Sequence, residues 1–165
     1  MASDIQVRRA KLADSEEIAT FINRAPNASD VTRSDIAERF GQVGFLLAER
    51  GDQLVGLLGW QIENLVVRMT DFLVVERPAE PLSVGEPLIA MMEEEARSLQ
   101  AEVIILFLPR HPSPDLIAYW EEIGYERQPI SKLPGAWCEA VEEWSEDLKW
   151  AMIKRLRDDL THRPM

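Results

Sequence analysis

The sequence predicts a mixed α/β fold in which a central sheet of about six or seven strands carries helices on both faces. Strand and helix patterns follow one another as one strand, two helices, three strands, a helix, a strand, a helix, and one or two strands. Three consecutive strands are typical of an antiparallel meander, and strands separated by helices are typical of crossover connections. In addition, Val103–Leu108 is apolar throughout, as expected of a strand buried on both faces.

The first half of the chain supplies the meander. Asp14 and Glu17 have the spacing of a capping box and predict the start of a helix. The dipeptide Gly51-Asp52 between two apolar segments predicts a hairpin turn. The elements expected here are a strand, two helices and three strands: Ile5–Ala10, Asp14–Asn23, Thr32–Phe40, Phe45–Glu49, Leu54–Ile62 and Val66–Val75.

The second half of the chain supplies the crossover helices. Ser83 and Glu86 have capping-box spacing ahead of an apolar stripe that predicts the strongest helix, and Gly124 is suited to ending a later one. The expected elements are a helix, a strand, a second helix, another strand and a helical insertion: Ser83–Leu99, Val103–Leu108, Asp115–Gly124, Tyr125–Ser131 and Pro134–Glu143. The pattern of Leu148–Leu156 fits either a helix or a strand.

Length and composition indicate one globular domain. The 165 residues can bury a substantial core, and 46% of them are hydrophobic while 28% are charged. No repeat or linker divides the chain, so we expect a single domain over residues 1–165, with 157–165 as a frayed tail. Cys138 is the single cysteine, which excludes an intrachain disulfide and a cysteine-based metal cluster.

The charge balance narrows the classes of partner. With 29 acidic and 18 basic residues, the formal net charge is -11. Such a chain repels phosphate backbones and anionic lipid surfaces, so we expect no nucleic-acid or membrane partner. A cationic amine is compatible with this charge. We find neither a secretory leader nor an apolar segment long enough to span a bilayer, so a cytoplasmic location is expected.

Several segments resemble the GNAT superfamily of acyltransferases. Leu54–Gly59 resembles the third strand of the family, and Phe72–Val75 followed by Ser83–Ile89 resembles its fourth strand and acyl-CoA helix. Tyr119–Tyr125 resembles the aromatic helix end of the family. Met152–Leu156 resembles its last strand, which favours an extended conformation for that segment. The order of these segments extends the resemblance over the whole chain and implies a GNAT-like fold.

The resemblance implies a site for acetyl-CoA. In the family, pyrophosphate binds to free backbone N–H groups at a helix N-terminus, and pantetheine pairs along the fourth strand. Carried onto this sequence, the residues that match those positions are Leu73, Val75, Ser83, Val84, Gly85 and Glu86. The chain departs from the family pattern at Glu80, where Arg or Gln is usual, and at Ser83, which replaces the first glycine, while Pro81 removes one possible N–H donor. An ordinary capping box formed by Ser83 and Glu86 is the competing interpretation.

The catalytic groups implied by the resemblance are also altered. Trp120 takes the place of the tyrosine that protonates the leaving thiolate in many members, and its indole cannot act as an acid at neutral pH. Tyr119 is therefore a candidate general acid, although it lies about 100° further round a helix. Asp71 and Glu63 are candidate general bases near the strands that would line a substrate cleft. His111 is more readily explained as a surface loop residue.

Two functions remain open at this point. One is an acyl-CoA-dependent N-acyltransferase that moves an acetyl group from acetyl-CoA to a primary amine, on a small molecule or a peptide. The other is a non-catalytic GNAT-like binding or interaction module that has lost the phosphate cradle and the general acid. The sequence does not identify the acceptor, and it leaves the oligomeric state open, including a homodimer.

Overall fold

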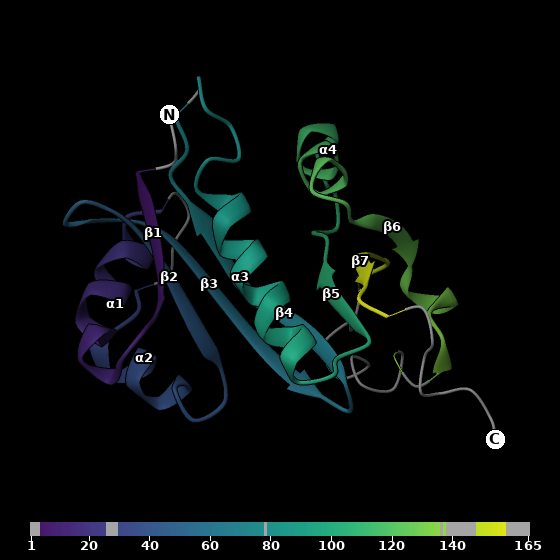
Figure 1. Ribbon diagram of the computed structural model, residues 1–165, viewed down its shortest axis with the longest axis horizontal. Coiled ribbons are helices and arrows are strands. Elements are labelled where there is room, and N and C mark those ends of the chain that lie inside the picture. The colour runs from purple at the N-terminus through teal and green to yellow at the C-terminus, as the bar shows by residue number, and fades with distance from the viewer. Residues whose placement is uncertain (1–3, 26–29, 78, 136, 138–147, 158–165) are drawn as a thin grey trace. The chain divides into compact units, whose positions relative to one another are not determined.

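A computed structural model describes residues 4–25, 30–77, 79–135, 137 and 148–157, and it contains the predicted mixed sheet (Figure 1). Seven strands lie in the order β1-β2-β3-β4-β5-β7-β6. The strands are β1 (Ile5–Arg9), β2 (Gly44–Arg50), β3 (Gln53–Glu63), β4 (Val66–Val74), β5 (Val103–Phe107), β6 (Glu126–Pro129) and β7 (Trp150–Arg155). The α-helices are α1 (Ser15–Asn23), α2 (Arg33–Arg39), α3 (Gly85–Ser98) and α4 (Pro114–Glu122), with 3-10 turns at Leu12–Asp14 and Ile130–Lys132.

Contacts divide the chain into two compact units. The first comprises Met1–Gln61 and Thr70–Met92, and the second comprises Ile62–Met69 and Glu93–Met165. The prediction of a single domain over residues 1–165 stays a prediction.

The first unit is built on the antiparallel strands β1, β2 and β3. Val7 lies opposite Ala48 and Leu46 opposite Leu58, with an irregularity between Ala48 and Glu49. One apolar cluster joins α1 and α2 to these strands: Ile18, Ala19, Phe21, Ile36, Val43, Phe45, Leu47, Leu54 and Leu57. Burial of this set, rather than helix propensity, explains how helices of nine and seven residues are stable.

Gly56 lets the start of α3 approach β3 closely. A Cβ atom at this position would lie 2.7 Å from a methyl carbon of Val84 and 2.8 Å from one of Leu88. Any larger residue would therefore push the first turns of α3 away from the strand. Gly56 and the apolar stripe of α3 thus fix where the N-terminus of that helix lies within the first unit.

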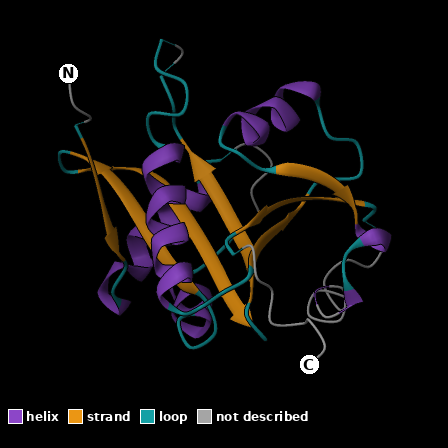
Figure 2. Ribbon diagram, turned by 45° about the vertical axis from the view of Figure 1, so that its right-hand side comes forward, coloured by secondary structure: helices purple, strands orange, loops and turns teal. Residues whose placement is uncertain are grey.

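The second unit is built on β5 and β7. The start of β4 runs parallel to β5, with Val66, Val67 and Arg68 opposite Val103, Ile104 and Ile105. Strand β7 is antiparallel to both β5 and β6. Figure 2 distinguishes the strands of the fold from its helices by colour. A second apolar cluster contains the fully buried Trp137 together with residues of several elements of this unit: Val66, Val103, Ile105, Ile130, Leu133, Ala151 and Ile153.

The connection between β3 and β4 is a two-residue turn. Asn64 and Leu65 both have positive φ angles, 52° and 69°, as a type I′ hairpin turn requires. Leu is less suited than Asn to a positive φ angle. The carbonyl of Leu65 accepts a hydrogen bond of 2.8 Å from the Glu102 N–H, and this bond holds Leu65 in place.

The predicted order of elements is confirmed, with three local corrections. Asp14 precedes α1 but makes no side-chain cap to it. Helix α4 begins at Pro114, and its N-cap is Ser113 rather than Asp115, because the Ser113 hydroxyl accepts from the Leu116 N–H. Extended structure after Gly124 covers only β6 and ends in a 3-10 turn. The segment assigned to the last strand is confirmed as β7.

The predicted insertion Pro134–Glu143 lies mostly outside the described residues, as does Cys138. None of the helices in the described ranges is long and apolar enough to cross a bilayer.

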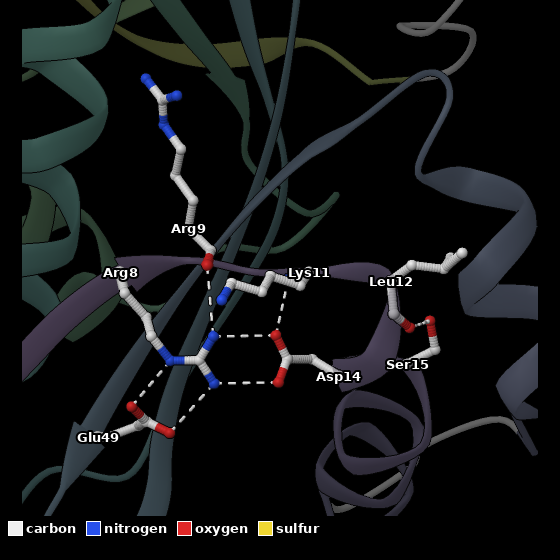
Figure 3. A network of polar contacts seen from close by, with 7 residues as sticks. All are labelled: Arg8, Arg9, Lys11, Leu12, Asp14, Ser15 and Glu49. Atoms are coloured by element: carbon white, nitrogen blue, oxygen red, sulfur yellow. Dashed lines mark hydrogen bonds and ion pairs between the residues drawn. The ribbon is translucent and has the colours of Figure 1, made fainter.

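The Asp14 carboxylate belongs to a polar network that links β1, β2 and the turn before α1 (Figure 3). The Arg8 guanidinium donates two hydrogen bonds to Asp14, of 2.9 and 3.0 Å, and two to Glu49, of 3.0 and 3.3 Å. Asp14 also accepts from the Lys11 N–H at 2.7 Å. The hydrogen bonds from Arg8 are the main cause that lowers the pKa of the Asp14 carboxyl below its usual value of 3.8.

We expect Asp14→Asn to destabilise the protein by about 1 kcal/mol at pH 7, because Arg8 is partly exposed and surface pairs contribute little. The folded pKa of Asp14 lies below the unfolded one, so its stabilisation is present above 3.8 and is lost as the pH falls below that value. Urea unfolding should therefore show a smaller difference in the free energy of unfolding between Asp14→Asn and the unmodified protein at pH 3 than at pH 7. Glu16→Gln, an exposed neighbour, is the control and should show neither effect; an equal Asp14→Asn loss at both pH values contradicts this assignment.

Candidate functional site at the entrance of helix α3

The entrance of α3 is held by the carboxylate of Glu76, which lies just beyond the end of β4. One carboxylate oxygen accepts a hydrogen bond of 2.7 Å from the Val84 N–H, and the other accepts one of 3.2 Å from the Gly85 N–H. The Ser83 hydroxyl also donates to Glu76, at 3.3 Å. A negative charge is stabilised here by the first N–H groups of the helix and by its dipole.

The two remaining N–H groups at this entrance are also donated to the protein. The Ser83 N–H donates to the Glu80 carbonyl at 3.2 Å, and the Glu86 N–H donates to the Leu82 carbonyl at 2.9 Å. The capping box predicted for Ser83 and Glu86 is therefore wrong. All four backbone donors from Ser83 to Glu86 have acceptors within the chain.

The backbone before α3 is strained. Leu82 has a φ of 75°, in the left-handed region that a residue with a side chain adopts at a cost of roughly 1–2 kcal/mol. This turn aims the N–H groups of Val84 and Gly85 at Glu76. Strained backbone of this kind is often found at binding sites, here with a ligand supplied by the chain itself.

Acidic side chains surround this entrance. In addition to Glu76, two further acidic residues lie here, Glu80 and Glu86, and the side chains of these two are exposed. Glu80 pairs with Arg77 at 3.4 Å, and because both side chains are more than half exposed, this pair contributes little. The local charge is unfavourable for a diphosphate.

The structure places candidate Leu73 within β4 and candidate Val75 directly after that strand. The Val75 N–H donates to the Val55 carbonyl of β3 at 2.8 Å, although the Val75 side chain is exposed. Leu73 packs against the apolar cluster of the first unit.

The two candidate bases lie in different surroundings. Asp71 accepts hydrogen bonds of 2.5 and 3.3 Å from the Arg39 guanidinium and one of 2.6 Å from the Thr70 hydroxyl. Gly59 leaves room for this group, because a Cβ there would be 2.5 Å from an Asp71 oxygen. Asp71 is thus an ion-paired carboxylate. Glu63 is exposed at the end of β3, beside the hairpin turn.

The aromatic residues near α4 are mostly structural. Trp120 is 2% exposed, and the Tyr119 ring meets it edge-on, with centroids 5.5 Å apart. Trp120 also packs against Tyr125 at 5.3 Å. Trp120 is thus a core residue, as its apolar spacing indicates. His111 is exposed in the loop after β5.

Tyr125 belongs to a buried polar cluster that the sequence does not reveal. Its hydroxyl donates to Glu93 at 3.0 Å, and the Lys154 ammonium donates to both oxygens of Glu93, at 3.0 and 3.2 Å. Burial first, and then the charge of Glu93, raise the pKa of Tyr125 well above its usual value of 10. A phenol held in this way is a poorer acid than a free tyrosine.

Known proteins share the architecture of this chain rather than its sequence. No protein-family model and no curated protein matches it. Among solved structures, an acetyltransferase of the GNAT family from Staphylococcus aureus Mu50 superposes with a TM-score of 0.70 at 16% identity, covering 93% of this chain and 99% of the other. The chain has the GNAT fold. Ribosomal-protein-S18-alanine N-acetyltransferase from Escherichia coli gives a TM-score of 0.66 at 11% identity, over 98% of this chain and 99% of the other.

A structure that contains a cofactor is also similar. The structure of yncA from Salmonella typhimurium with acetyl-CoA superposes with a TM-score of 0.66 at 14% identity, over 98% of this chain and 99% of the other. The GNAT fold implied by the sequence resemblance is confirmed, and it extends over nearly the whole chain.

Proposed function

We propose that this protein is a GNAT-fold binding module whose acyl-CoA phosphate cradle is filled by its own Glu76, and not an acyl-CoA-dependent transferase. One observation supports this most strongly: each backbone N–H from Ser83 to Glu86 already has an acceptor in the chain. The GNAT cradle works through free N–H groups at this helix entrance. Here an internal carboxylate supplies the negative charge instead.

The energetics of displacement support the same conclusion. Hydrogen bonds from amides to a charged group contribute about 1.5–3 kcal/mol each. A diphosphate would have to break both of those made by Glu76, and it would then lie near the carboxylates of Glu76, Glu80 and Glu86. Since about 1.4 kcal/mol corresponds to a factor of ten in affinity, binding should be weakened by one or more orders of magnitude.

The state of the catalytic candidates agrees with a non-catalytic role. Trp120, at the position of the family's acid, is buried, and the candidate base Asp71 is paired with Arg39. Tyr119 and Glu63 remain the candidates for acid and base.

The second candidate function is an acyl-CoA-dependent N-acyltransferase that acts on a primary amine of a small molecule or a peptide. It is favoured by the GNAT fold and by the acetyl-CoA in the structure of yncA. In this case acetyl-CoA would displace Glu76 and bind along Leu73 of β4 and Val75 just after it, and at Ser83, Val84, Gly85 and Glu86. The acidic surface suits a cationic amine acceptor, and a homodimer is compatible with either function.

Calorimetric titration with acetyl-CoA distinguishes the two functions. For the binding module we expect no saturable heat with about 1 mM acetyl-CoA. Saturation at that concentration would require a Kd below about 1 mM, which means more than about 4 kcal/mol of binding free energy. Citrate synthase, which binds CoA thioesters, serves as a positive control for the cofactor preparation. Saturable binding at micromolar concentration, with acetylation of an added amine, would overturn the proposal in favour of the transferase.

A further inference from the structure

A groove between α1 and the β2–β3 hairpin is a concave site of a size that suits a small ligand. Its volume is about 410 Å³, within the usual range for small-molecule sites. Glu17 and Phe21 of α1 and its C-cap residue Arg24 line the groove, at the spacing of neighbours on one side of a helix. All of its lining residues belong to the first unit, and none of them forms the entrance of α3.

The groove has an apolar floor and a rim with charges of both signs. Phe21 and Leu54 form the floor and are 9% and 7% exposed. Glu17 and Asp52 supply negative charges to the rim, and Arg24 and Arg50 supply positive ones.

Most of this charge is available to a ligand. Arg50 is anchored by an ion pair of 3.2 Å with Asp4. Within the part of the chain that the structure describes, the side chains of Glu17, Arg24 and Asp52 form no hydrogen bond or ion pair.

We propose that this groove binds a free α-amino acid with an apolar side chain. A simple anion would be repelled by Glu17 and Asp52, and a simple cation by Arg24 and Arg50. A zwitterion can place its carboxylate at a guanidinium and its ammonium at a carboxylate, while an apolar side chain covers Phe21 and Leu54. The inference rests on the proposed function, because it supplies the ligand site of the binding module. The groove shares no residue with the α3 entrance, so the two proposals can fail separately.

The test is a ¹⁵N-¹H correlation titration of the full chain with L-leucine. We expect saturable shifts confined to the amides of residues 17–24 and 50–54, with a Kd on the order of 1 mM. N-acetyl-L-leucine lacks the ammonium and L-leucinamide lacks the carboxylate, so each should bind about fivefold more weakly. Arg24→Gln should weaken L-leucine binding to a similar extent, whereas Glu16→Gln on the exposed side of α1 should leave it unchanged.

Two results would overturn this inference. One is the absence of localised shifts up to about 20 mM L-leucine, well above the expected Kd. The other is equal binding of all three probes, since that would show apolar adhesion without recognition of the charged groups. A separate titration of the same samples with acetyl-CoA reports on the α3 entrance, so failure of the groove leaves the Glu76 proposal intact, and the reverse also holds.

Discussion

Glu76→Ala should raise the affinity for acetyl-CoA at least about tenfold, because it frees two backbone donors that are otherwise bound by charge-assisted hydrogen bonds worth about 1.5–3 kcal/mol each. The same change removes the cap of α3 and should lower the free energy of unfolding by about 1–2 kcal/mol. Calorimetry measures the first effect and urea unfolding the second.

Glu86→Ala is the matched control for this experiment. It removes one negative charge from the same entrance without releasing an N–H group, since the Glu86 N–H is bound to Leu82 and its side chain is exposed. We expect at most about a threefold gain in affinity from this exposed charge. Equal gains from both variants would mean that charge alone limits binding, and the occupied cradle would then not be the cause.

Lys154→Met should destabilise the protein by about 3 kcal/mol at pH 7, because it leaves the Glu93 carboxylate without its cation. Glu93 is 7% exposed, and in the absence of Lys154 it would keep the hydrogen bond from the Tyr125 hydroxyl. The value lies at the lower end of those measured for broken buried pairs, since the Lys154 side chain is 25% exposed.

The matched variant replaces the whole cluster by apolar residues: Glu93→Met, Tyr125→Phe and Lys154→Met. Removing all the polar groups together leaves no buried charge, so the loss should be clearly smaller than that of Lys154→Met alone. Urea unfolding followed by circular dichroism measures both. If the single variant is within about 0.5 kcal/mol of the unmodified protein, Glu93 is not held as we describe.

The fold could be predicted from the sequence because its signals are local or periodic. Apolar alternation located β1, and the Gly51-Asp52 turn located the hairpin of β2 and β3. The periodicity of the segment that forms the last strand, β7, fits either a helix or a strand, and only the resemblance to the family favours the strand.

The hydrogen-bond partners within the site come from residues that are distant in the sequence, and a local sequence pattern does not show such contacts. The backbone positions from Ser83 to Glu86 could be located in advance, but their partner Glu76 lies eight and nine residues before Val84 and Gly85. Likewise, Tyr125 and Glu93 are 32 residues apart, and Lys154 is 61 residues from Glu93. The acidic residue just after β4 is a signal that could have been used for Glu76, because carboxylates favour helix N-termini.

The most direct measurement of the occupied cradle follows the amide resonances of Val84 and Gly85. In the unmodified protein we expect them to keep their positions when acetyl-CoA is added to about 1 mM, and in Glu76→Ala we expect them to shift with saturation. Saturable shifts of both amides in the unmodified protein at micromolar acetyl-CoA would contradict the account, because they would show that Glu76 yields the cradle to the cofactor.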